Sequence, residues 1–153
     1  MTRVDFYFNA KGRLETALIL VRKAVTQNKR ALIFSSDAAL LGRVDQLLWV
    51  SQPTSFLPHV RATDPLASVT PVLLASRADE APHPLDEILF NLDPAPPPHF
   101  ARFERMIEIV GRDDEADLVA ARKRYKFYKD RGYELVTNDL LALSKEPKVA
   151  RNG

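Results

Sequence analysis

Residues 105–133 read RMIEIVGRDDEADLVAARKRYKFYKDRGY, and this stretch predicts one strand followed by one long helix. Met106–Val110 is a short run of mostly β-branched apolar residues, which is typical of a buried strand. Asp113 or Asp114 is placed to cap the helix, and Gly132 is placed to end it. A strand that leads directly into a helix is the repeating unit of an α/β fold.

Strand-like and helix-like stretches alternate through the rest of the chain as well. Further strands are predicted at Val4–Phe8, Ala31–Phe34, Val72–Ala75 and Ile88–Leu92, and further helices at 14–24 and, after a cap at Ser36 or Asp37, along the apolar stripe of 40–48. This alternation favours a single α/β domain over residues 1–142, with a mostly parallel, Rossmann-like sheet and helices on both faces. We expect residues 143–153 to form a flexible C-terminal tail.

Proline-rich stretches separate some of these elements. Residues 50–71 contain four prolines and are expected to be mostly loop. Residues 93–98 read DPAPPP and can form neither a helix nor an inner strand, because proline lacks the amide donor that both require. Residues 100–105 are expected to form a helical turn.

Composition excludes several classes of protein. The chain has 153 residues, of which 46% are hydrophobic, so one domain can bury a substantial core. It contains no cysteine, which excludes disulfides and thiolate metal sites and fits a cytoplasmic protein. No run of about 18 uncharged apolar residues occurs, so no membrane-spanning segment is expected.

Charge is distributed unevenly along the chain. Between Leu118 and Tyr133 there are six basic residues and one acid, so this segment carries +5. Because the whole chain carries only +2, the remainder carries −3. A basic helix on a slightly acidic body indicates an acidic partner at that helix.

The basic residues of this helix are ordered around its axis. Arg122, Lys126 and Lys129 fall within about 60° of one another at helical spacing, and Tyr125 lies at the border with an apolar strip. Such a face can hold an acidic peptide with an apolar anchor. It can equally hold single-stranded nucleic acid through the basic helix 114–131, or be no more than a solvated amphipathic surface.

A second conspicuous stretch, QLLWVSQPTSFLPHV, covers residues 46–60. Trp49 is the only tryptophan, and Phe56 and Leu57 follow it in a proline-flanked segment. Large apolar residues in such a place either fill the edge of the core, which residue type favours, or present an anchor to a partner.

Sequence signatures of catalysis and cofactor binding are absent. Neither a dinucleotide-binding fingerprint nor a phosphate-binding P-loop occurs, and the first turn after a strand holds one glycine, Gly12. The three histidines have no metal-ligand spacing, and their expected role is structural or at the surface. We therefore expect no enzymatic activity, no cofactor and no metal.

Five ordered segments of the chain resemble one known family. They are TRVDFYF at residues 2–8, NKRALIFSSD at 28–37, QLLWVSQPTSFLPHV at 46–60, ILFNL at 88–92 and the stretch that begins at Arg105 and ends in GYEL. Together they are similar to the chi subunit family of the DNA polymerase III clamp-loader complex.

The resemblance implies a non-catalytic adaptor in bacterial DNA replication. Chi subunits bind the acidic C-terminal tail of single-stranded DNA-binding protein and join the clamp loader through the psi subunit, so contact with DNA would be indirect. The implied tail-binding residues are Val110, Arg122, Tyr125, Lys126, Lys129 and Gly132. The implied residues for a psi-like clamp-loader partner are Trp49, Phe56 and Leu57.

Overall fold

A computed structural model describes residues 1–50, 57–77 and 85–145 of the chain. These residues form a seven-stranded sheet in which every neighbouring pair of strands is parallel. In spatial order the strands are β3 (His59–Arg61), β4 (Val72–Ala75), β2 (Ala31–Phe34), β5 (Ile88–Asn91), β6 (Arg105–Gly111), β1 (Arg3–Ala10) and β7 (Glu134–Asp139).

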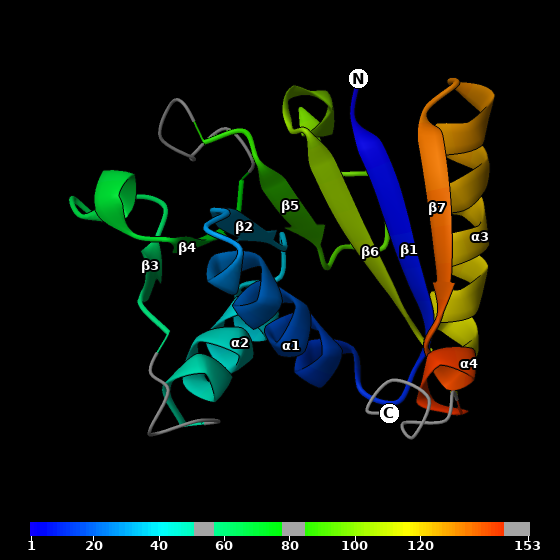
Figure 1. Cartoon of the computed structure of the whole chain (residues 1–153), viewed down its shortest axis with the longest axis horizontal. Helices are drawn as coiled ribbons and strands as arrows, with labels where there is room; N and C mark the ends of the chain where they lie inside the picture. The colour runs from blue at the N-terminus through cyan, green and yellow to red at the C-terminus, as the bar shows by residue number, and fades with distance from the viewer. Residues whose placement is uncertain (51–56, 78–84, 146–153) are drawn as a thin grey trace, which may run out of the picture.

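Helices cover both faces of the sheet (Figure 1). One face packs against α1 (Arg13–Thr26) and α2 (Ala38–Val50), and the opposite face packs against α3 (Glu115–Asp130). A short helix, α4 (Leu140–Lys145), follows β7, and the described residues also include 3-10 turns at η1 (Ala67–Val69) and η3 (Phe100–Arg102). The predicted Rossmann-like α/β architecture is confirmed.

The inner strands are buried on both sides. In β2, Ala31 and Ile33 pack toward α1 and α2, whereas Leu32 and Phe34 pack toward the α3 face. Alternate residues of a strand point to opposite faces, so a strand covered by helices on both sides is largely apolar. This requirement explains the continuous apolar runs that made these strands predictable.

The predicted helix caps are present. The Asp37 carboxylate accepts from the amides of Ala39 and Leu40 at 2.9 and 3.2 Å, and it caps α2. The Asp114 carboxylate accepts from the Asp117 amide at 3.1 Å and caps α3. Gly132 follows α3 with a φ of 79°, a conformation that glycine adopts without strain.

The sequence does not predict two of the strands, β3 and β7. The stretch 50–71, expected to be mostly loop, contains β3 and η1. β3 has only three residues and pairs with one neighbour, so it leaves little pattern in the sequence. β7 carries polar residues at Glu134, Thr137, Asn138 and Asp139, because it is an edge strand that is only partly buried.

The C-terminal end of the fold also differs from the expected boundary. Residues 143–145, expected to begin the flexible tail, belong to α4. Residues 146–153 of that expected tail lie outside the described part of the chain.

Candidate binding site

A cavity of about 180 Å³ lies between α3 and the sheet. Three strands and the helix contribute to its wall: Phe6 and Phe8 from β1, Val110 from β6, Thr137 from β7, and Leu118, Ala121, Arg122 and Tyr125 from α3. Arg122 is the one charged residue in this set. We call this cavity the α3 pocket; it is an apolar hollow with a cation on its lining.

Three of the expected tail-binding residues meet in this pocket. Val110 is buried near the end of β6, and Arg122 is exposed on α3. Tyr125 is half-buried, and its ring centroid lies 5.3 Å from that of Phe6 at a tilt of 60°. Aromatic packing of this kind fixes the tyrosine ring as one wall of the pocket.

The other three expected residues lie beyond the pocket. Lys126 is exposed, and its Nζ lies 2.8 Å from the Asp130 carboxylate one turn further on. Lys129 is exposed in the last turn of α3. Gly132 follows the helix and does not line the pocket.

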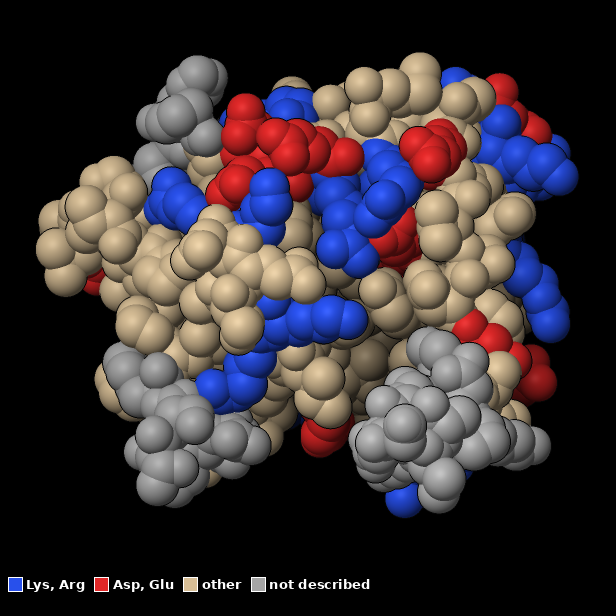
Figure 2. Space-filling view, viewed as in Figure 1, with Lys and Arg blue, Asp and Glu red and all other residues tan. Residues whose placement is uncertain are grey.

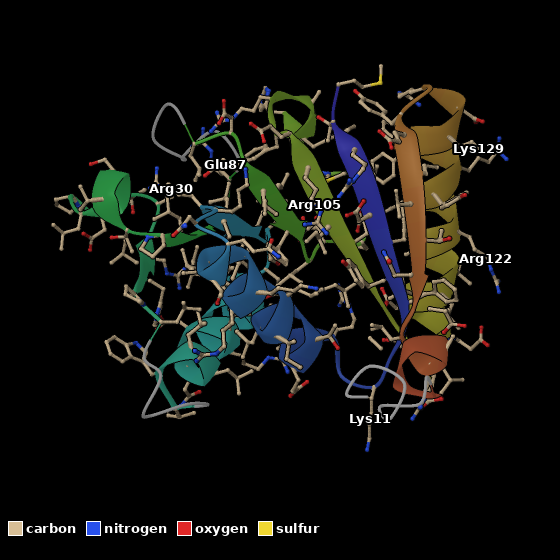
Figure 3. All side chains as sticks on the ribbon, viewed as in Figure 1. Lys11, Arg30, Glu87, Arg105, Arg122 and Lys129 are labelled. Atoms are coloured by element: carbon tan, nitrogen blue, oxygen red, sulfur yellow. The ribbon has the colours of Figure 1, made fainter. Side chains whose placement is uncertain are left out.

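Three of the exposed cations of α3, namely Arg122, Lys126 and Lys129, are spaced to lie on one side of the helix. Figure 3 shows Arg122 and Lys129 projecting away from the sheet in the same direction. Basic side chains are correspondingly prominent at the margin of the molecule where α3 lies (Figure 2). The pocket therefore continues into a basic row toward the C-terminal end of the helix.

Arg124 is one of the basic residues of this segment, but in the structure its side chain is buried, unlike the cations described above. Its side chain is 1% exposed, and its Nε donates to the Glu108 carboxylate at 2.9 Å. Its Nη1 donates to the Pro94 carbonyl at 3.0 Å. With this cation removed from the surface, the segment presents five bases and Asp130, a net of +4.

Glu108 is the centre of a buried polar network that sequence reasoning missed. Asn91 Nδ2 donates to its carboxylate at 3.0 Å, the Tyr128 hydroxyl donates to it at 2.5 Å, and Arg124 completes the set. Complete burial raises the pKa of the Glu108 carboxyl, against the opposing effect of Arg124 and the other donors. A glutamate in the middle of the apolar run MIEIV was the available signal.

Tyr128 remains a hydrogen-bond donor in this network. Burial, and then the neighbouring Glu108 carboxylate, raise the pKa of the Tyr128 hydroxyl far above its ordinary value. The network joins α3 to β5, to β6 and to the proline-rich loop. It holds the helix, and with it Arg122 and Tyr125, in a fixed position on the sheet.

The second expected surface divides into exposed and buried residues. Trp49 is 57% exposed near the end of α2, whereas Leu57 is 5% exposed and belongs to the core. Phe56 lies outside the described residues. Leu57 therefore fills the edge of the core, whereas Trp49 presents its ring at the surface.

The His59 ring packs against the Trp49 ring. The two ring centroids lie 5.1 Å apart in an edge-on arrangement. The buried His59 ring contacts the Leu57 carbonyl through Nδ1 at 2.8 Å and the Asp45 carboxylate through Nε2 at 3.0 Å. His59 is a hydrogen-bonded structural histidine, as the sequence predicts.

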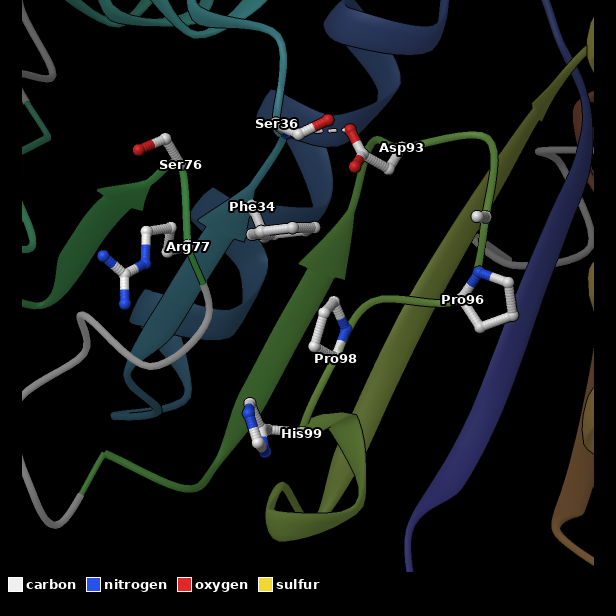
Figure 4. A pocket seen from close by; sticks show the side chains of 9 residues that line it. Phe34, Ser36, Ser76, Arg77, Asp93, Pro96, Pro98 and His99 are labelled. Atoms are coloured by element: carbon white, nitrogen blue, oxygen red, sulfur yellow. Dashed lines mark hydrogen bonds between the residues drawn. The ribbon is translucent and has the colours of Figure 1, made fainter.

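A larger cavity of about 510 Å³ opens where β2, β4 and β5 end (Figure 4). Sheets of this type bind nucleotides at such an edge. Here, however, the Asp93 carboxylate accepts from the Ser36 amide at 2.8 Å and the Ser35 hydroxyl at 3.1 Å, and so it serves the loop structure. The described lining includes no glycine, so it lacks the residue that lets a backbone approach a phosphate.

The described residues include neither a metal-ligand cluster nor a membrane-spanning helix. No group of three or more histidine, cysteine, aspartate or glutamate side chains within them could hold a metal ion. No helix in this part of the chain is long and apolar enough to cross a membrane.

Comparison with known proteins identifies the family. The sequence model described as "DNA polymerase III chi subunit, HolC" matches residues 1–136. The chain belongs to the DNA polymerase III chi subunit family. This membership assigns the chi-family chain to the DNA polymerase III complex and to DNA replication.

Three chi subunits illustrate how similar this chain is to other members. It is 32% identical to that of Pseudomonas aeruginosa over 139 residues, which cover 88% of this chain and 94% of the relative. Identity to the Haemophilus influenzae chi subunit is 28%, covering 82% and 86% of the two chains. Identity to the Escherichia coli chi subunit is 30%, covering 71% and 73%.

Proposed function

We propose that this chi-family chain is a non-catalytic adaptor that binds the acidic C-terminal tail of single-stranded DNA-binding protein and links it to the clamp loader. The observation that carries the proposal is the α3 pocket, in which apolar walls and the Arg122 guanidinium lie side by side. A peptide that ends in an apolar residue has a carboxylate next to an apolar side chain. The apolar walls of the pocket are complementary to the side chain, and the Arg122 guanidinium is complementary to the carboxylate.

Each part of such a tail has a partner on α3. Arg122 can pair with the terminal carboxylate through two parallel hydrogen bonds. The last apolar side chain can fill the hollow between Val110, Phe6 and Tyr125. Acidic residues further upstream meet Lys126 and Lys129, which are exposed and attract them through solvent, so their contribution falls as salt is added.

The clamp-loader side of the adaptor is assigned to Trp49 on α2. An exposed tryptophan supported by a fixed ring is the kind of residue that dominates protein interfaces. α2 and α3 lie on opposite faces of the sheet, over strands at different ends of the strand order (Figure 1). A psi-like subunit at Trp49 would therefore leave the α3 pocket accessible.

Titration with a synthetic peptide that copies the acidic tail tests the proposal. We expect binding at low salt and weaker binding at high salt. Arg122→Ala should weaken binding by about 10- to 100-fold, since a hydrogen bond to a charged group is worth about 1.5–3 kcal/mol. Lys123→Ala is the matched control, because Lys123 is exposed next to Arg122 but does not line the pocket.

A peptide with an amidated C-terminus completes the experiment. It should lose affinity for the parent protein and lose little for Arg122→Ala, because the carboxylate and the guanidinium act as a pair. Absence of peptide binding at either salt concentration would exclude the proposal. The same variants would then be titrated with single-stranded DNA, the alternative partner of the basic helix.

A further inference from the structure

β7 presents an unusually open edge. It is the last strand of the sheet, and within the described residues its backbone pairs with β1 alone. Its six residues, ELVTND, include two acids but neither lysine nor proline, which commonly protect an exposed edge, whereas the opposite edge strand, β3, has only three residues. An extended peptide can therefore add to the sheet at β7.

The α3 pocket reaches this edge. Thr137 of β7 lines the pocket, and the register places it opposite Phe6, which lines the pocket as well. Leu135 packs with the core on this same face. Arg122 lines the pocket together with Thr137, and it projects in the same direction as Lys129, away from the sheet (Figure 3). The free edge of β7 and Arg122, the first cation of the basic row, thus meet at the α3 pocket.

We propose that the acidic tail peptide, whose binding rests on the function proposed above, adds to the sheet as an eighth strand parallel to β7. The direction follows from the order of the residues along α3 and β7. The end of α3 adjoins the start of β7, where the Tyr133 amide donates to the Tyr128 carbonyl at 3.1 Å. Lys129 therefore lies toward the start of β7, and the pocket lies further along it, at Thr137.

The peptide has its anchor at its C-terminus, so its upstream residues must run from the pocket back toward Lys129. Its chain direction is then that of β7, as for every other strand pair in the sheet. β7 carries two acids, and Asp139, at its end, is in register with Phe8 and accepts from Asn9 Nδ2 at 2.8 Å. Glu134 is in register with Arg3, on the face opposite to the pocket.

Side-chain spacing agrees with this placement. Every second residue of a strand faces the same side, about 7 Å apart, so residues two and four positions before the anchor lie about 7 and 13 Å from it. Arg122 and Lys129 are seven residues apart on a helix, which is about 10.5 Å along its axis. Acidic residues two and four positions before the anchor would therefore lie on either side of Lys129 along the helix axis.

Peptides with selectively methylated backbone amides test the strand. In a parallel pair, alternate residues direct their N–H and C=O groups to the same neighbour. Two copies of the tail peptide would be made, one N-methylated at the odd positions and one at the even positions upstream of the anchor. We expect one copy to bind at least about tenfold more weakly and the other to bind like the unmodified peptide.

Hydrogen exchange of the protein provides the second measurement. The β7 amides that point away from β1 should exchange more slowly when the unmodified peptide is bound. Equal affinity of both methylated copies, or equal loss, would overturn the strand assignment while leaving peptide binding itself intact. Failure of the unmodified peptide to bind would instead overturn the proposed function. Protection of β7 that rises with protein concentration in the absence of peptide would identify a second copy of the chain as the occupant.

Discussion

Three neighbouring cations of α3 occupy three different environments. Arg122 lines the apolar pocket, Lys123 points into solvent, and Arg124 is buried against Glu108. Helical geometry separates consecutive side chains by about 100°, so adjacent residues can serve unrelated purposes. Substitution of one cation therefore tests binding, and substitution of another tests folding.

Arg124→Ala should destabilise the protein strongly. Removal of the guanidinium leaves the Glu108 carboxylate buried without its cation, a change that costs about 3–5 kcal/mol. Urea unfolding measures the loss, and Lys123→Ala serves as the exposed control, with an expected change below about 0.5 kcal/mol. The double variant Arg124→Ala/Glu108→Gln should recover part of the loss, since it removes the unpaired charge. If Arg124→Ala and Lys123→Ala were equally stable, Arg124 would not be the cation that stabilises the buried Glu108 carboxylate.

At the scale of the secondary-structure element, the start of α3 depends on Asp114. Its carboxylate accepts from the Asp117 amide and satisfies a donor that the helix itself leaves unpaired. Asp114→Ala should lower the free energy of unfolding by about 1 kcal/mol, measured by thermal or urea unfolding. Asp113→Ala is the matched control, because that side chain is 83% exposed and pairs with the Arg112 guanidinium at 3.5 Å. A control that is equally destabilised would show that charge, rather than capping, matters here.

The elements that sequence predicts are those whose environment is uniform along their length. β2 and β4 are buried on both faces, so each is an apolar run, β5 is apolar up to Asn91, and α3 has distinct caps. β7 has one free edge and mixed burial, so its polar residues hide it from a search for periodicity. Its partner, β1, is more than a hundred residues away in the chain, and sequence spacing carries no trace of that pairing.

The site was predictable to the same extent as the helix that carries it. Arg122 and Tyr125 lie one turn apart, and helical spacing alone placed them on one flank. Phe6, Phe8 and Thr137, which complete the pocket, come from strands that only the folded sheet brings together. The burial of Arg124 was likewise hidden, because its partner Glu108 lies on a different element.

At the scale of the whole molecule, the sheet separates the two proposed surfaces. α2 packs against one face and α3 against the other, and the buried strands between them form a rigid spacer (Figure 1). Such an arrangement suits a bridge between two partners, because occupancy of one surface leaves the other exposed. It also means that substitutions at the two surfaces should act independently.

This independence gives the last prediction. Trp49→Ala should abolish binding of a psi-like clamp-loader subunit and change the affinity for the acidic peptide by less than about twofold, since distant sites are additive. Arg122→Ala should show the reverse pattern. Ile19→Ala, which removes an apolar side chain that is 67% exposed on α1, is the control for a general loss of apolar surface. Sedimentation velocity with both partners should show a complex that contains all three components. Competition between the partners would mean that the two surfaces overlap, and the bridging arrangement would then be wrong.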